Sequence, residues 1–124
     1  MNYIIDSCIL IDHLRGIKNI DFLRKDKRNH IKMSIITMME LILGARNKKE
    51  VENIQKAFGK IEILNINDEI SELAYDLIFQ YNKSHNLLIN DAIIAATAIT
   101  NKTTLVTLNV SDFRFVPKIS LYKF

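Results

Sequence analysis

The sequence contains little glycine, proline or cysteine, and it has no long hydrophobic run. With three Gly and one Pro, the 124 residues show no linker, repeat or low-complexity segment, which indicates one domain over 1–124. The only cysteine, Cys8, excludes an internal disulfide and fits a reducing cytoplasm. Hydrophobic stretches are interrupted within about ten residues, too short to cross a membrane. The first residues carry no basic leader, so we expect no secretory signal.

Motifs of several enzyme classes are also missing. No glycine-rich loop is present to cradle a nucleotide, so hydrolysis of a nucleoside triphosphate finds no support. The potential zinc ligands Cys8, His13, His30 and His85 show none of the paired spacings of zinc sites. A Cys8–His13 nucleophile pair is an alternative, but Cys8 lies among aliphatic residues and is more typical of a core position.

Charge is unevenly distributed around a net value of +3. Residues 15–32 contain seven cations against two acids, whereas residues 62–91 contain six acids against one lysine. A basic face can hold a phosphate backbone through charge attraction and counterion release. On charge alone, a solvated helix face explains these cations better. The candidates for backbone binding are Arg15, Arg24, Lys25, Lys27 and Arg28.

Hydrophobic periodicity predicts strands that alternate with helices. The unbroken apolar run 3–5 indicates a strand buried on both faces, as in a parallel sheet. Further strands are expected at 31–33, 61–64 and 104–108, with an edge strand at 119–122. Helices are expected directly after Asp6, over 19–27, from Ser34, over 48–58, over 67–83 and from Asn90, with 84–86 as a connector.

Four acids, Asp6, Glu40, Asp91 and Asp112, lie at predicted strand ends or helix starts within apolar sequence. Each has an ordinary structural explanation. Asp6 can cap the helix that follows it, and Glu40 can form a capping box with Thr37. Asp91 can interact with the dipole of a helix capped by Asn90, and Asp112 can be a turn residue.

A shared metal site would explain the four acids together. Two carboxylates about 4 Å apart repel by roughly 4 kcal/mol at an effective dielectric near 20, and a divalent cation removes that cost. Ligation by oxygen alone suits Mg²⁺ or Mn²⁺. Metal ions held by carboxylates activate water and neutralise the charge that develops in phosphodiester cleavage.

Four motifs resemble those of the PIN-domain ribonucleases, in the family's order and spacing over nearly the whole chain. They are IIDSCILIDHLRG, SIITMMELILGA, INDAIIAATAI and TLVTLNVSDF followed by Val-Pro. Within this family the chain is most similar to the VapC-type toxins of prokaryotic toxin–antitoxin pairs. The resemblance implies an α/β fold: a single PIN-like domain with a mostly parallel sheet of about five strands sandwiched between helices.

The same resemblance implies which residues form the site. Family members carry their fourth acid either at the position of Asn109 or at that of Asp112. Asn109 can ligate only through a neutral carbonyl, so we expect Asp112 to take this role, with Asn109 supporting the site. Ser7 takes the place of the supporting Ser or Thr that follows the first acid. The remaining catalytic and metal-binding acids are Asp6, Glu40 and Asp91.

The implied function is a cytoplasmic, Mg²⁺-dependent endoribonuclease toxin. Its implied partners are an RNA substrate, a VapB-type antitoxin and a second copy in a homodimer, with no membrane. An RNA-processing PIN nuclease and a non-catalytic PIN-like binding module remain alternatives. A phosphoacceptor receiver domain fits less well, because Ser7 follows Asp6 where that chemistry needs a second acid, and Asn65 follows the third strand where it needs an aspartate.

Overall fold

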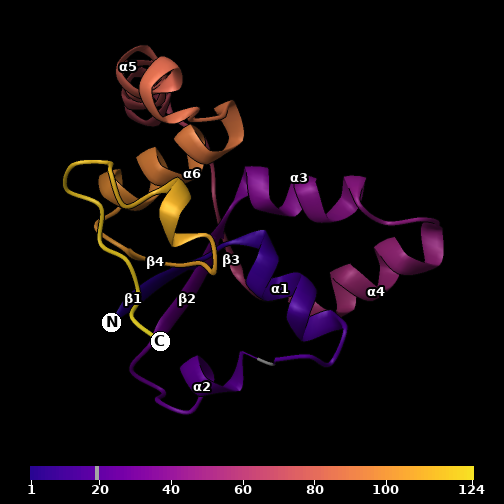
Figure 1. Ribbon diagram of the computed structural model, residues 1–124. Helices are drawn as coiled ribbons and strands as arrows, with labels where there is room; N and C mark the ends of the chain where they lie inside the picture. Colours follow the sequence, from indigo (N-terminus) through magenta and orange to yellow (C-terminus); the bar gives the residue numbers. More distant parts are fainter. Residues whose placement is uncertain (19) are drawn as a thin grey trace.

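The computed structural model describes residues 1–18 and 20–124, and its centre is a parallel sheet (Figure 1). The sheet contains β1 (Asn2–Ile5), β2 (His30–Ser34), β3 (Glu62–Leu64) and β4 (Thr104–Val106) in the spatial order β3-β2-β1-β4. The first strand pairs with both β2 and β4, so that Tyr3 lies beside Ile31 and Thr104. The predicted buried first strand is therefore confirmed.

Helices cover both faces of this sheet (Figure 1). Successive residues of β1 contribute to two separate hydrophobic cores. Ile4 packs in a core with α5 and α6, whereas Tyr3 and Ile5 pack in a core with α1 to α4. The described helices are α1 (Ser7–Leu14), α2 (Asp21–Arg24), α3 (Ile35–Leu43), α4 (Lys48–Phe58), α5 (Asp68–His85), α6 (Ile89–Thr100) and the short 3-10 helix η1 (Val110–Asp112). The expected α/β fold of a sheet between helices is thus confirmed.

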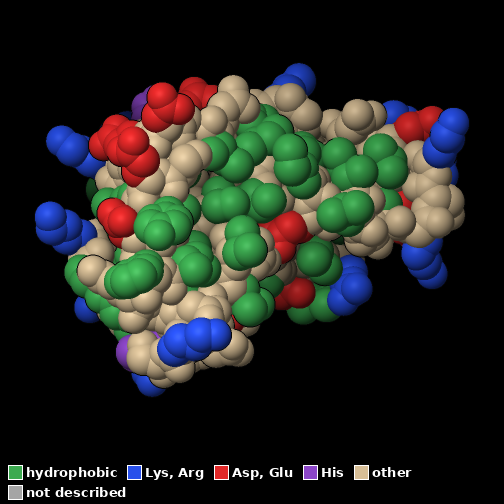
Figure 2. All heavy atoms as spheres, turned by 90° about the horizontal axis from the view of Figure 1, so that it is seen from above, with side chains coloured by type: hydrophobic (Ala, Val, Ile, Leu, Met, Phe, Trp, Pro, Cys, Tyr) green, Lys and Arg blue, Asp and Glu red, His purple; other side chains and the backbone are tan. Residues whose placement is uncertain are grey.

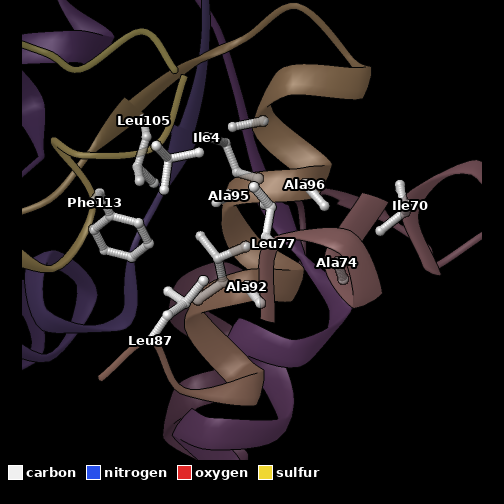
Figure 3. Packing of buried hydrophobic residues seen from close by; sticks show 13 residues of the cluster. Ile4, Ile70, Ala74, Leu77, Leu87, Ala92, Ala95, Ala96, Leu105 and Phe113 are labelled. Carbon is white, nitrogen blue, oxygen red and sulfur yellow. The ribbon is translucent and has the colours of Figure 1, made fainter. Parts of the chain in front are cut away.

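The helix α6 packs closely because its buried face is built from small residues. Ala92, Ala95 and Ala96 are fully buried against neighbours that include Ile4 of β1 and Leu105 of β4 (Figure 3). Alanine keeps the backbone of α6 near both the sheet and α5 at no cost in side-chain entropy. This packing fixes where the first turn of α6 lies relative to the strand ends.

Several element boundaries differ from the sequence-based predictions. The expected edge strand 119–122 is reduced to a single parallel bridge between Leu105 and Leu121, so the described sheet has four strands. The expected helix 19–27 begins at residue 19, outside the described residues, and is present as the short α2. The expected connector 84–86 is wrong in part, since α5 continues to His85 and ends where Asn86 adopts a left-handed φ of 55°.

Within the described part of the chain, no helix is both long and apolar enough to cross a membrane.

Candidate active site

The first acid, Asp6, lies where the central strand β1 ends, and only 5% of its surface is exposed. Its Oδ1 accepts a hydrogen bond of 2.8 Å from the backbone N–H of Ser7, so Asp6 does cap α1. Its Oδ2 accepts a hydrogen bond of 2.7 Å from the hydroxyl of Thr107, directly after β4. The cap therefore accounts for one carboxylate oxygen only, and the other oxygen is held by Thr107 at the end of a second strand.

Glu40 lies on α3 and is not part of a capping box. The N-cap of α3 is Ser34, whose hydroxyl accepts from the backbone N–H of Ile36 at 3.2 Å, so Thr37 lies inside the helix. The Oε2 atom of Glu40 accepts a hydrogen bond of 2.9 Å from the side-chain amide of Asn90. Burial raises the pKa of Glu40, and the nearby charge of Asp6 raises it further.

Asp91 lies in the first turn of α6, and the predicted cap by Asn90 is wrong. The N-cap position belongs to Leu88, which has no capping side chain. The pKa of Asp91 is raised to about 6, first by burial and then by the charges of Asp6, Asp112 and Glu40. A carboxylate that served only the helix dipole would have a lowered pKa. The charges of acids from three other segments of the chain therefore act on Asp91.

The last segment of the site follows β4. Asp112 ends η1 on the surface, and its charge reaches Asp91. Asn109 precedes η1, and its backbone N–H donates to the hydroxyl oxygen of Thr107 at 3.0 Å. Thr107 thus connects this segment to Asp6. The sequence analysis missed Thr107 because the strand was expected to run to 108; its position directly after β4 repeats that of Asp6 after β1.

The Cys8–His13 nucleophile pair is wrong. The thiol of Cys8 lies 3.7 Å from both Oδ2 of Asp6 and the hydroxyl of Thr107. The Nδ1 atom of His13 instead accepts from the backbone N–H of Ile20 at 3.2 Å. Burial raises the pKa of Cys8, which keeps the thiol protonated and unreactive at neutral pH.

The donor atoms of this acidic site suit a hard divalent cation. Among the described residues, no three His, Cys, Asp or Glu side chains are close enough to hold a metal ion as they stand. Ligation of a cation would therefore require side chains to rotate; Asp91 is partly exposed and Asp112 is exposed. The Oε1 atom of Glu40 is buried without a hydrogen-bond partner, a state that costs about 1–3 kcal/mol. A cation would satisfy this oxygen and relieve the repulsion on Asp91.

A groove of about 700 Å³ between α1, α3 and α4 has Glu40 in its wall. Two arginines also line it: the predicted Arg15 and Arg46, which the sequence analysis did not consider. The guanidinium of Arg46 pairs with Glu50 at 2.7 Å. Arg46 lies three residues beyond Leu43, the last residue of the helix that carries Glu40, and this closeness in sequence is the signal that could have identified it.

The other predicted basic residues lie at the opposite end of the sheet, where β1 and β2 begin. The amino group of Met1 donates to the backbone oxygen of Arg28 at 3.5 Å. The backbone N–H of His30 donates to the backbone oxygen of Met1 at 2.8 Å. The side chain of Arg28 pairs with Asp26 at 2.8 Å. The structure therefore does not bring Arg24, Lys25, Lys27 and Arg28 to the acids.

The face that carries α3, α5 and α6 is broadly hydrophobic. Figure 2 shows green side chains over much of this face, with acidic side chains among them near its middle. Exposed apolar side chains on α3 and at the start of α6 are Met39, Ile42, Leu43, Leu88 and Ile89. Exposed apolar surface of this extent is typical of a site that a partner covers.

Comparisons with known proteins agree with this fold. The family model described as PIN domain matches residues 3–118. Ribonuclease VapC10 of Mycobacterium tuberculosis is 34% identical over 115 residues, covering 89% of this chain and 84% of that protein. Among solved structures, VapBC2 from Rickettsia felis bound to a DNA fragment from their promoter aligns with a TM-score of 0.81 at 25% identity, over 100% of this chain and 99% of that chain. A toxin–antitoxin complex from Klebsiella pneumoniae aligns with a TM-score of 0.77 at 29% identity, over 98% and 99%.

Proposed function

The chain belongs to the PIN-domain family, and we propose that it is a divalent-metal-dependent endoribonuclease, the toxin of a VapBC-type toxin–antitoxin pair. Family membership excludes the receiver-domain alternative. The relatives named as VapC ribonucleases favour a toxin over an RNA-processing nuclease. We propose a cytoplasmic location with this role, because the free thiol of Cys8 fits a reducing compartment.

The observation that carries this proposal is the placement of the acids: Asp6 is buried at the end of β1, Glu40 bonds to the residue before Asp91, and the charges of the other acids raise the pKa of Asp91. The pKa of Asp91 is raised by burial and then by the charges of Asp6, Asp112 and Glu40, so the ionised form of Asp91 is electrostatically unfavourable at this position. Gathering four carboxylates from four segments does not help to stabilise a core, because burial of unpaired charges costs free energy. A cation-dependent reaction gives a reason for it, because the same arrangement then binds the metal and its substrate.

We propose Asp6, Glu40, Asp91 and Asp112 as the ligands, with Mg²⁺ as the cation and Mn²⁺ as a substitute. These residues would hold a divalent cation, which would supply an activated water and neutralise charge on the scissile phosphate. Ser7 and Thr107 orient the Asp6 carboxylate through one oxygen each. Asn109 supports this arrangement through its bond to Thr107, and Arg15 holds a phosphate of the bound RNA in the groove beside Glu40.

Cleavage of RNA by the purified protein tests the assignment. We expect cleavage with Mg²⁺ or Mn²⁺ and none with EDTA. Asp6→Ala and Asp91→Ala are each expected to remove activity while circular dichroism shows an unchanged fold. Full cleavage by the Asp91→Ala protein would overturn the metal site, whereas absence of cleavage by the wild-type protein with either cation would leave the non-catalytic binding module as the better explanation.

We propose that the hydrophobic face over α3, α5 and α6 holds the partners, a second copy of the chain and a VapB-type antitoxin. An antitoxin that silences the site can do so with an Arg or Lys that replaces the cation among the carboxylates. Expression of the protein alone should slow growth, and co-expression with the antitoxin encoded beside it should restore growth. Normal growth with abundant folded protein would contradict the toxin role.

A further inference from the structure

A single hydrogen bond joins the two helices that carry the second and third acids. The side-chain amide of Asn90 on α6 donates to Oε2 of Glu40 on α3 at 2.9 Å, across 50 positions of sequence. Because Leu88 holds the N-cap position of α6, Asn90 is not used as a cap. Asn90 directly precedes Asp91 in the chain. The bond therefore holds the Glu40 carboxylate against the turn of helix that carries the third acid.

The two oxygens of Glu40 have different surroundings. Oε2 receives the amide of Asn90, whereas Oε1 is buried and has no hydrogen-bond partner. A carboxylate held at one oxygen keeps a fixed orientation, and its second oxygen is free for another ligand. We propose that Asn90 is a positioning residue, which holds Oε2 of Glu40 so that Oε1 is presented to the metal ion. This inference rests on the proposed function of the site.

An amide is well suited to this task. Lys or Arg at position 90 would also bind Glu40, but its charge would neutralise the carboxylate and compete with the cation. The amide of Asn90 is neutral, so it orients Glu40 and leaves the full negative charge for the metal. Hydrogen bonds of this kind to metal-binding side chains commonly account for about 10- to 100-fold in metal affinity or activity.

A purely structural role is the alternative, in which the bond only ties α3 to α6. Asn101 provides a matched control for that case. It is the C-cap residue of the same helix, and its side-chain amide donates to the backbone oxygen of Thr97 at 2.9 Å, with no acid involved. Asn101→Ala therefore removes an equally short amide bond from α6 and leaves Glu40 as it is.

The decisive measurement is the dissociation constant of Mg²⁺ for the protein without RNA, by calorimetry or by Mg²⁺-dependent thermal shift. We expect Asn90→Ala to weaken Mg²⁺ binding by about 10-fold or more, with a metal-free melting temperature close to that of Asn101→Ala. Asn90→Leu, which keeps the volume but has no donor, should behave in the same way, so loss of folding by the alanine variant would not hide the effect. Asn90→Gln retains an amide and should recover part of the affinity.

Cleavage kinetics give a second readout. At Mg²⁺ concentrations that saturate each protein, Asn90→Ala should reduce kcat and leave KM for RNA nearly unchanged, because Asn90 acts through Glu40. Wild-type affinity for Mg²⁺ in both Asn90→Ala and Asn90→Leu would overturn the positioning role while the nuclease assignment stands. Absence of Mg²⁺ binding and cleavage in the wild-type protein would overturn the proposed function itself, and the inference with it.

Discussion

The hydroxyl of Thr107 donates to Oδ2 of Asp6 at 2.7 Å, although the two residues are 101 positions apart in the chain. Thr107 is 1% exposed and Asp6 is 5% exposed, so the bond is shielded from water. The same hydroxyl oxygen accepts from the backbone N–H of Asn109 at 3.0 Å. The ends of β1 and β4 are therefore linked through one buried side chain that also holds the segment leading to Asp112.

Replacement of Thr107 by Val tests this link. The change keeps a similar shape and leaves Oδ2 of Asp6 without its main donor, so unfolding free energy should fall by about 1–3 kcal/mol. Cleavage should fall as well, since Asp6 loses its fixed orientation. Chemical denaturation and cleavage assays measure the two effects.

Thr104→Val is the matched control, because the hydroxyl of Thr104 pairs with that of Ser120 at 3.0 Å on the surface. It should lose well under 1 kcal/mol and keep its activity, as surface substitutions generally do. Equal losses in both variants would show that the bond to Asp6 has no special weight.

The raised pKa of Asp91 predicts how pH affects the metal-free protein. An acid with a folded pKa of about 6 binds a proton more tightly in the folded state than in the unfolded state, whose pKa is near 3.8. Its contribution to stability is therefore lost as pH rises from about 4 to 6 and stays absent above 6. Asp91→Asn should thus stabilise the EDTA-treated protein at pH 7.5, by about 1 kcal/mol after allowance for solvent screening, and change it little at pH 4.

With Mg²⁺, the wild-type protein should be more stable than Asp91→Asn. At about one hundred times its dissociation constant, Mg²⁺ adds roughly 2.7 kcal/mol to the wild type. For a domain of this size the melting temperature should rise on the order of 10 °C. Asn at position 91 should remove most of this rise. If Asp91→Asn is instead destabilised equally with EDTA and with Mg²⁺, and the wild type shows no shift, Asp91 is a helix-start residue only.

Cys8 should be dispensable for chemistry. Its thiol is half-buried and its pKa is raised, so it is a poor nucleophile at neutral pH. Cys8→Ser keeps a small polar side chain beside Asp6 and should retain most of the cleavage activity. Labelling of the folded wild type by a thiol reagent at pH 7.5 should be slow compared with labelling in denaturant. Loss of cleavage in Cys8→Ser with normal Mg²⁺ binding would reopen the nucleophile alternative.

The placement of the basic residues separates Arg15 from the others. Arg15 lines the groove that Glu40 shares, so Arg15→Gln should weaken RNA binding and reduce its salt dependence by about 0.7 in the log–log slope. The double change Lys25→Gln and Lys27→Gln removes more charge, but these residues lie at the other end of the sheet. It should leave the log–log slope of RNA affinity against salt concentration unchanged for the binding that leads to cleavage. A larger effect of the double change would place the RNA path over that end.

Sequence reasoning succeeded where local pattern decides the outcome. The apolar run of β1 and the amphipathic 48–58 helix were predicted with correct or nearly correct bounds, because burial on both faces and on one face leave distinct patterns. It failed where a choice depends on distant residues. Thr37 and Asn90 both have good local capping signals, but Ser34 caps α3 and Asn90 bonds to Glu40, 50 positions away.

The four site acids were selected from the sequence, and in the structure the charges of Asp6, Glu40 and Asp112 all act on Asp91. Their separation from the basic segment could not be predicted. Arg24 ends α2 and residues 25–28 follow it, and only the pairing of β1 with β2 determines that this turn lies at the amino ends of the strands. The sequence shows how much charge is present, whereas the connections between strands determine which end of the sheet receives it.

The position of β1 between β2 and β4 also affects how the protein is made. A ribosome adds about 5–20 residues per second, so Thr107, which lies 101 positions after Asp6, is added roughly 5–20 s later. During that time β1 can pair with β2 on one side, while its other edge and the Asp6 carboxylate wait for β4. An incomplete chain should therefore be unable to cleave RNA. Ribosome-bound chains stopped at residue 100 should be inactive, whereas ribosome-bound chains with all 124 residues, extended by a linker, should cleave RNA.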